Sequence, residues 1–173
     1  KLNTLDVGGG FPAFTPYAHQ IHAAPELSSY VAEIQAARMS SGLLNTRLVT
    51  EPGRALVADA GVTIARVVEV DEDKNAVSLN TGTFGGLYDG REEIGFRFTS
   101  YAFNASGAVD AASRNMTVYG PTCDSADVMN GQWPMPRNLA DGDYVAFENT
   151  GAYGMPAFAS AFNGMGKHQT LAI

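Results

Sequence analysis

The stretch Leu5-Asp-Val-Gly-Gly-Gly-Phe-Pro12 decides how the first part of the chain folds. It joins a short apolar run, Leu2–Val7, to three successive glycines, which indicates a buried strand that ends in a glycine loop. Apolar side chains then recur at helical spacing over residues 27–37, and Gly42 is suited to end that helix. A second apolar run follows at Leu43–Thr50. Strand, helix and strand in this order predict a parallel βα unit.

The sequence changes character near residue 60. β-Branched residues dominate Val62–Val70, a charged turn follows, and Ala76–Asn80 is expected to return as the second strand of a hairpin. Turn residues separate three further strand candidates, which are Gly95–Phe103, Met116–Tyr119 and Tyr144–Phe147. Runs of strands after a βα unit predict an α+β fold, with a first unit over residues 1–60 and a β-domain over residues 61–173.

The composition argues against several classes of function. The net charge is −7 and Lys and Arg number only eleven, whereas a nucleic acid backbone is bound by a basic surface. No apolar run approaches the roughly 20 residues that cross a bilayer. The single cysteine cannot form an internal disulfide, which fits a reducing compartment. We therefore expect a cytoplasmic protein with neither nucleic acid nor membrane as a partner.

Two turns with glycines are expected at the carboxyl ends of the parallel strands. Gly8, Gly9 and Gly10 can present consecutive backbone N–H groups to an anion, because no side chain blocks the approach; the alternative is a tight turn without a ligand. Glu51-Pro-Gly-Arg54 adds another glycine and a guanidinium suited to phosphate. Parallel folds bind ligands at this edge, so the two turns together predict a phosphate site.

Two further turns carry reactive side chains. The turn Tyr119–Asp124 places the only cysteine, Cys123, beside a carboxylate, although a lone cysteine is more often a small buried residue. The turn Glu148–Tyr153 by itself indicates only a turn with a buried tyrosine. His19 and His22 have no third ligand near them in the sequence, so we expect no metal site.

Taken as a set, these motifs resemble the fold-type III, pyridoxal-phosphate-dependent decarboxylases of basic amino acids. The resemblance covers nearly the whole chain and is carried, in order, by Leu5–Pro12, Glu51–Arg54, Gly120–Ser125, Gly151–Tyr153 and Ala161–Gly164. Residues 82–87 are most similar to the bacterial ornithine/lysine branch. The alternatives are a diaminopimelate or arginine decarboxylase of the same fold, and a non-catalytic regulatory relative.

The resemblance implies a fold and an activity. The fold would be the last βα elements of an alanine-racemase-like (β/α)8 barrel, followed by a C-terminal β-domain of barrel or sandwich type whose last residues pack back on the barrel. The protein would be a homodimer with active sites at the interface, giving putrescine from ornithine or cadaverine from lysine in polyamine biosynthesis. The family's Schiff-base lysine lies in a motif that this sequence lacks. We therefore expect the segment to belong to a longer or complemented protein and to be inactive alone.

The resemblance also implies cofactor contacts. The phosphate of pyridoxal 5'-phosphate would be held by residues from three motifs, which are Gly8, Gly9, Gly10, Gly53, Arg54 and Tyr153. The carboxylate of Glu51 would pair with the pyridinium nitrogen and keep it protonated.

Substrate contacts follow from the same resemblance. Cys123 would return a proton to the former α-carbon of the substrate from the partner subunit, Asp124 would accept the distal ammonium, and Phe162 would line the pocket. A second acid is expected in the loop after residue 86. Glu93 is the first candidate there, with Glu92 next and Asp89 third, and a solvated acidic turn is the alternative for each.

Overall fold

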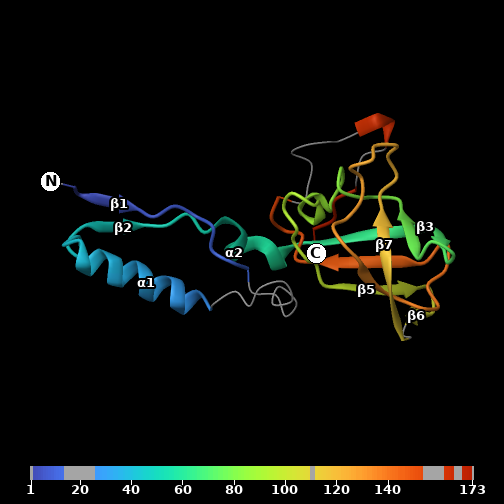
Figure 1. Cartoon of the computed structure of the whole chain (residues 1–173), viewed down its shortest axis with the longest axis horizontal. Coiled ribbons are helices and arrows are strands. Elements are labelled where there is room, and N and C mark those ends of the chain that lie inside the picture. The colour runs from blue at the N-terminus through green and yellow to red at the C-terminus, as the bar shows by residue number, and fades with distance from the viewer. Residues whose placement is uncertain (1, 14–25, 110–111, 154–161, 166–168, 173) are drawn as a thin grey trace.

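An extended βαβ segment leads through a short helix into a curled β-sheet (Figure 1). The computed structural model describes residues 2–13, 26–109, 112–153, 162–165 and 169–172. No helix within these ranges has both the length and the apolar character needed to cross a membrane.

The βαβ segment contains β1 (Thr4–Asp6), α1 (Leu27–Ser40) and β2 (Arg47–Val49). The two strands run parallel, which confirms the predicted βα unit. Gly42 ends the helix as expected: its φ is +68°, and the next residue's N–H donates back to the carbonyl of Arg38 at 2.8 Å. No residue of α1 is buried, however, and its apolar residues Leu27, Val31 and Met39 are 38%, 46% and 64% exposed.

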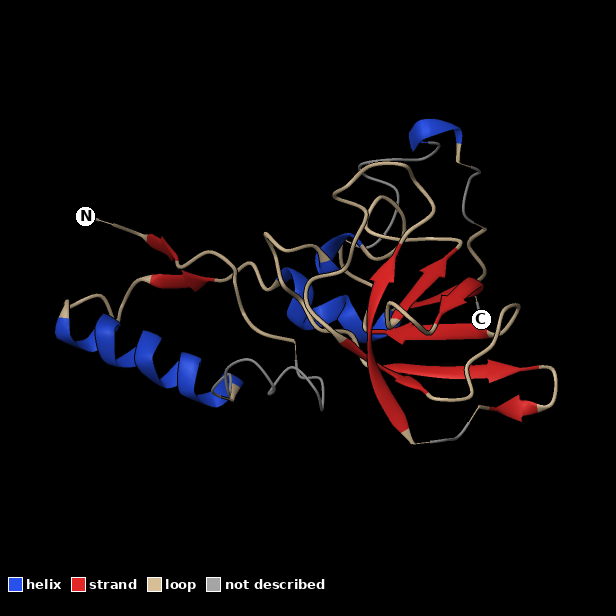
Figure 2. Cartoon of the chain, turned by 45° about the vertical axis from the view of Figure 1, so that its right-hand side comes forward, coloured by secondary structure: helices blue, strands red, loops and turns tan. Residues whose placement is uncertain are grey.

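The sheet has seven strands in the order β6-β5-β9-β3-β4-β7-β8, and only β4 and β7 run parallel. Figure 2 shows the strands of this sheet together on one side of the molecule, apart from the βαβ segment. The strands are β3 (Val62–Asp71), β4 (Ala76–Leu79), β5 (Ser100–Asn104), β6 (Gly107–Ala108), β7 (Ser113–Tyr119), β8 (Trp133–Pro136) and β9 (Tyr144–Glu148). The predicted β3–β4 hairpin is confirmed. The strand predicted from Gly95 begins only at Ser100, and β6 and β8 were not predicted.

Alternation along β3 shows why the sheet curls around one core. Ala65 and Val67 are fully buried, while Ile64 before them and Val68 after them are more than half exposed. The single tryptophan, Trp133, belongs to this core and is 1% exposed. Its indole N–H donates to a backbone carbonyl at 3.2 Å, and aromatic rings of β9 and the loop before β5 pack against it.

The sheet does not close completely. A cavity of about 520 Å³ remains on the inner side, between β5 and β8. Arg97 lines this cavity, and its guanidinium carbon lies 4.7 Å from the ring centre of Trp133. Burial lowers the pKa of Arg97 from its usual value.

The junction between segment and sheet consists of α2 (Gly53–Val57) and a 3₁₀ helix, η2 (Ala58–Ala60). The chain leaving β9 returns to this junction: the N–H of Gly151 donates to the carbonyl of Ala58 at 2.9 Å. A Cβ at Gly61 would lie 2.7 Å from the Cα of Gly151, so both positions require glycine. This close approach brings the residues after β9 against α2.

Candidate functional site

The two glycine-containing turns lie side by side at the ends of β1 and β2. The N–H of Glu51 donates to the carbonyl of Gly8 at 2.8 Å, and a Cβ at Gly9 would lie 2.6 Å from the carbonyl oxygen of Glu51. The middle glycine is therefore required for the two turns to meet. The prediction that both turns share one edge of the parallel pair is confirmed.

The glycine loop is open on its outer side. Gly8 and Gly10 have φ values of +71° and +79°, which glycine adopts without strain. A Cβ at either position would have no neighbouring atom within 4 Å. The N–H of Gly8 already donates to the side chain of Asp6 at 2.9 Å. The loop thus offers an unobstructed backbone surface of the kind that accommodates a phosphate group.

Tyr153 and the second turn meet at α2. A Cβ at Gly53 would lie 2.7 Å from the hydroxyl oxygen of Tyr153, and the guanidinium carbon of Arg54 lies 5.1 Å from the centre of the tyrosine ring. The expected burial of this tyrosine is wrong: Tyr153 has a φ of +54° and is 59% exposed. Its ring covers the surface of α2 instead of entering the core.

The partner of Arg54 was not predicted. Its Nη1 lies 2.5 Å from Oδ2 of Asp89, whose side chain is 3% exposed, and its guanidinium also lies over the ring of Phe96 at 4.5 Å. Asp89 belongs to the 3₁₀ helix η3 (Tyr88–Gly90). The third candidate for a substrate-binding acid therefore binds the arginine that was expected to hold phosphate. We call Gly8, Gly9, Gly10, Glu51, Gly53, Arg54, Asp89 and Tyr153 the glycine-loop cluster.

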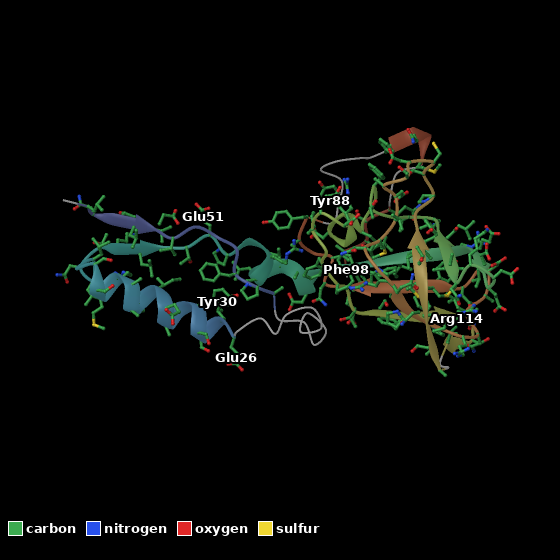
Figure 3. The ribbon with its side chains drawn as sticks, in the orientation of Figure 1. Glu26, Tyr30, Glu51, Tyr88, Phe98 and Arg114 are labelled. Carbon is green, nitrogen blue, oxygen red and sulfur yellow. The ribbon has the colours of Figure 1, made fainter. Side chains whose placement is uncertain are left out.

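Glu51 occupies the βαβ side of this cluster. Its side chain is exposed, and Figure 3 shows it on the segment, while Tyr88 of η3 lies among the loops on the side of the sheet that faces the segment. Its pairing with a pyridinium nitrogen stays a prediction.

A second group of side chains surrounds Cys123. The thiol is exposed rather than buried, and the side-chain amide of Asn163 donates to its Sγ at 3.4 Å. Phe162 stacks on Phe84, with ring centres 4.2 Å apart and planes 5° from parallel. Asp124 is exposed and accepts a hydrogen bond from the N–H two residues later at 2.8 Å. We call Phe84, Cys123, Asp124, Phe162 and Asn163 the cysteine-loop cluster.

The two other candidate acids are exposed. Glu93 forms an ion pair with Arg91 at 3.3 Å, and its side chain is 67% exposed. A hydrogen bond from its own backbone N–H lowers the pKa of Glu93, and the charge of Arg91 adds to this effect. Glu92 is also exposed. A role for either acid in substrate binding stays a prediction.

Asp127, which is 2% exposed, was not predicted as a site residue. Its carboxylate lies between the turn that carries Cys123 and the loop that carries Phe84, and it accepts hydrogen bonds from Thr122 and Thr83. The available signal was weak: one more Asp, three residues after Asp124 and five residues after Thr122.

Among the described residues, no group of three or more His, Cys, Asp and Glu side chains is arranged to hold a metal ion. His19 and His22 lie outside these residues.

Comparison with known proteins identifies the class of this domain. Residues 17–151 match the family described as pyridoxal-dependent decarboxylase, C-terminal sheet domain. The ornithine decarboxylase of Schizosaccharomyces pombe is 31% identical over 180 residues, which are 95% of this chain and 37% of that protein. The diaminopimelate decarboxylase of Actinosynnema pretiosum subsp. auranticum is 29% identical over 185 residues, covering 100% of this chain and 39% of that protein.

A solved structure agrees with both sequence matches. The lysine/ornithine decarboxylase of Vibrio vulnificus, complexed with cadaverine, superposes with a TM-score of 0.74 at 29% identity, over 99% of this chain and 44% of that chain. The fold and the sequence thus agree on the class of this domain, the C-terminal sheet domain of pyridoxal-dependent decarboxylases. The chain belongs to the decarboxylase family that acts on basic amino acids and contains its C-terminal sheet domain, which confirms the resemblance noted above. It spans less than half the length of these relatives.

Proposed function

We propose that the chain is the C-terminal part of a pyridoxal-phosphate-dependent decarboxylase that converts ornithine to putrescine or lysine to cadaverine. The observation that carries this proposal is the convergence of three separate motifs at α2. The carbonyl of Glu51 lies against Gly9, the hydroxyl of Tyr153 lies against Gly53, and the intervening guanidinium is that of Arg54. This convergence places an open glycine loop, a guanidinium and a tyrosine hydroxyl around α2, which is the set of groups that binds a phosphate.

The proposal includes the domain organisation. β1, α1 and β2 would be the last elements of a (β/α)8 barrel within residues 1–60, and residues 61–173 would form the β-domain. The uncovered apolar side chains of α1 support this assignment, because barrel helices pack against neighbouring barrel elements. The active form would be a homodimer with its sites at the interface.

The residues of the glycine-loop cluster fit the phosphate of the cofactor. The backbone of the open glycine loop and the guanidinium of Arg54 would bind it, while Asp89 fixes the direction of that guanidinium. Glu51 would hold a proton at the ring nitrogen. When bound, pyridoxal phosphate supplies the electron sink for the electrons released as carbon dioxide leaves.

The cysteine-loop cluster would act on the substrate. Sγ of Cys123 would hold the proton that the α-carbon receives after carbon dioxide has left. The carboxylate of Asp124 would bind the distal ammonium, and the stacked rings of Phe84 and Phe162 would exclude water. In the homodimer these groups would serve the partner's cofactor.

Substrate preference tests the proposal. In the longer enzyme, kcat/KM for ornithine and for lysine is expected to exceed that for arginine and diaminopimelate by about tenfold or more, with ornithine slightly favoured. Asp124→Ala should lower kcat/KM for both preferred substrates by at least about tenfold, because the ammonium loses its carboxylate. Asp73→Ala, which removes an exposed acid in the β3–β4 turn, is the control.

A preference for diaminopimelate would instead support the second candidate, a diaminopimelate decarboxylase. Relatives of that kind are about as similar to this chain as the ornithine enzymes. If kcat/KM is the same for Asp124→Ala and for its control, Asp73→Ala, then Asp124 does not bind the substrate.

The chain alone is expected to form no covalent adduct with pyridoxal phosphate. The sequence lacks the motif that carries the family's Schiff-base lysine, and Lys74 lies in the β3–β4 turn, where it pairs with Asp71 at 2.6 Å and its side chain is 80% exposed. Incubation with the cofactor, reduction with borohydride and an intact mass measurement check this. The longer enzyme, treated in parallel, should gain one adduct per chain. A stoichiometric adduct on the chain alone would contradict the expectation.

A further inference from the structure

We infer that Asp127 is a positioning residue, whose buried carboxylate sets the conformation of the cysteine loop (residues 120–126) and thereby the placement of the thiol of Cys123. The relevance to catalysis rests on the function proposed above, whereas the positioning itself is a property of this chain.

Each oxygen of the carboxylate holds a different loop. Oδ1 accepts from the backbone N–H of Thr83 at 2.8 Å and lies 3.1 Å from its hydroxyl. Oδ2 accepts from the backbone N–H of Thr122 at 3.0 Å and from its hydroxyl at 2.7 Å. A buried carboxylate requires such donors, because burial without them is strongly unfavourable. The acid and its two threonines therefore form one interdependent unit.

The backbone around the carboxylate is shaped to admit it. A Cβ at Gly82 or at Gly120 would overlap with the carboxyl group of Asp127, so glycine is required on both sides. The main chain of Asp127 also closes the cysteine loop: its carbonyl accepts from the N–H of Gly120 at 2.8 Å, and its N–H donates to the carbonyl of Asp124 at 3.0 Å.

Both threonines immediately precede a residue of the cysteine-loop cluster. Thr122 precedes Cys123, and Thr83 precedes Phe84, which stacks on Phe162. A small pocket of about 70 Å³ lies between the two loops and is lined by Thr122, Asp127, Phe84 and Phe162, among others. One carboxylate thus fixes the thiol-bearing loop relative to the aromatic pair.

The single cysteine makes the inference testable on this chain without any cofactor. The rate at which iodoacetamide alkylates Cys123 is measured by intact mass, far below the unfolding temperature. The alkylation rates of the wild type and the variants are compared at high pH, where the rate no longer rises with pH. Every thiol is then ionised, so differences in thiol ionisation do not affect the comparison. Asp127→Asn is expected to change this rate by about fivefold or more, because the amide cannot accept all four donors. The matched control is Asp143→Asn, which alters a different buried Asp, one that accepts the N–H of Ala140 at 3.0 Å.

Two variants of Thr122 provide the decisive comparison, because both leave the charged carboxylate of Asp127 in place. Thr122→Val should change the alkylation rate in the same direction as Asp127→Asn, and Thr122→Ser, which retains the hydroxyl, should restore the wild-type rate. Hydrogen exchange of the amides in residues 120–126 should follow the same order. If Asp127→Asn does not fold, this pair still decides the question.

Wild-type alkylation rates in both Asp127→Asn and Thr122→Val would overturn the inference. So would a change of the same size in Asp143→Asn, which would indicate general loosening of the sheet. Absence of decarboxylase activity in the longer enzyme would instead contradict the proposed function and leave the measured positioning intact.

Discussion

Replacing Asp89 with asparagine is expected to lower the free energy of unfolding by about 3 kcal/mol, because it leaves the guanidinium of Arg54 largely buried and unpaired. The side chains of Arg54 and Asp89 are 20% and 3% exposed, so water cannot fully compensate either charge. Arg54→Met should destabilise the chain by a similar amount. The double variant should lose much less free energy of unfolding than the two single variants lose together. The difference, the coupling energy, is expected to be about 2 kcal/mol.

Urea unfolding, followed by the fluorescence of Trp133, gives the free energy of unfolding of the wild type, the two single variants and the double variant. All four are measured at one protein concentration. Asp71→Asn is the matched control, since it breaks the pair with Lys74, whose side chain is 80% exposed, and should change stability little. Additive effects of the two single variants, within about 0.5 kcal/mol, would show that Arg54 and Asp89 do not depend on each other.

Replacing Cys123 with alanine in the longer enzyme is expected to lower kcat by about 100-fold, the usual contribution of a positioned proton donor. The fraction of aldehyde among the products should rise, because the proton is then delivered at the wrong atom. Cofactor affinity should stay unchanged, since the glycine-loop cluster is untouched. Turnover, the amine-to-aldehyde ratio and cofactor affinity are the three measurements.

The neighbouring Ser125→Ala is the control for this variant, because it removes an exposed polar atom from the same turn without removing the thiol. Unchanged turnover and product ratio in Cys123→Ala would reduce the thiol to a packing role.

Local patterns predicted much of the fold. The parallel β1–β2 pair, the end of α1 at Gly42 and the β3–β4 hairpin all depend on periodicity and turn chemistry that the sequence displays directly. β8 was missed because Trp133-Pro-Met-Pro136 contains two prolines, which argue against a central strand. β8 is at the end of the sheet and pairs only with β7, where prolines are tolerated.

The part of the candidate site that lies at the ends of β1 and β2 could be predicted from the sequence. The meeting of Gly9 with Glu51 follows from two parallel neighbours. The pairing of Arg54 with Asp89 joins residues 35 positions apart and depends on how the loop after β4 packs, which no local pattern encodes. The same holds for Asp127, whose threonine partners come from two different loops.

The ends of the sheet have a consequence for association between molecules. An exposed strand edge is a template to which a strand of another chain can add. At one end β8 carries Pro134 and Pro136, which have no N–H to donate, and at the other end β6 is only two residues long. Neither end offers an incoming strand a continuous row of donors and acceptors. The curled sheet can therefore remain open without promoting growth of intermolecular β-structure.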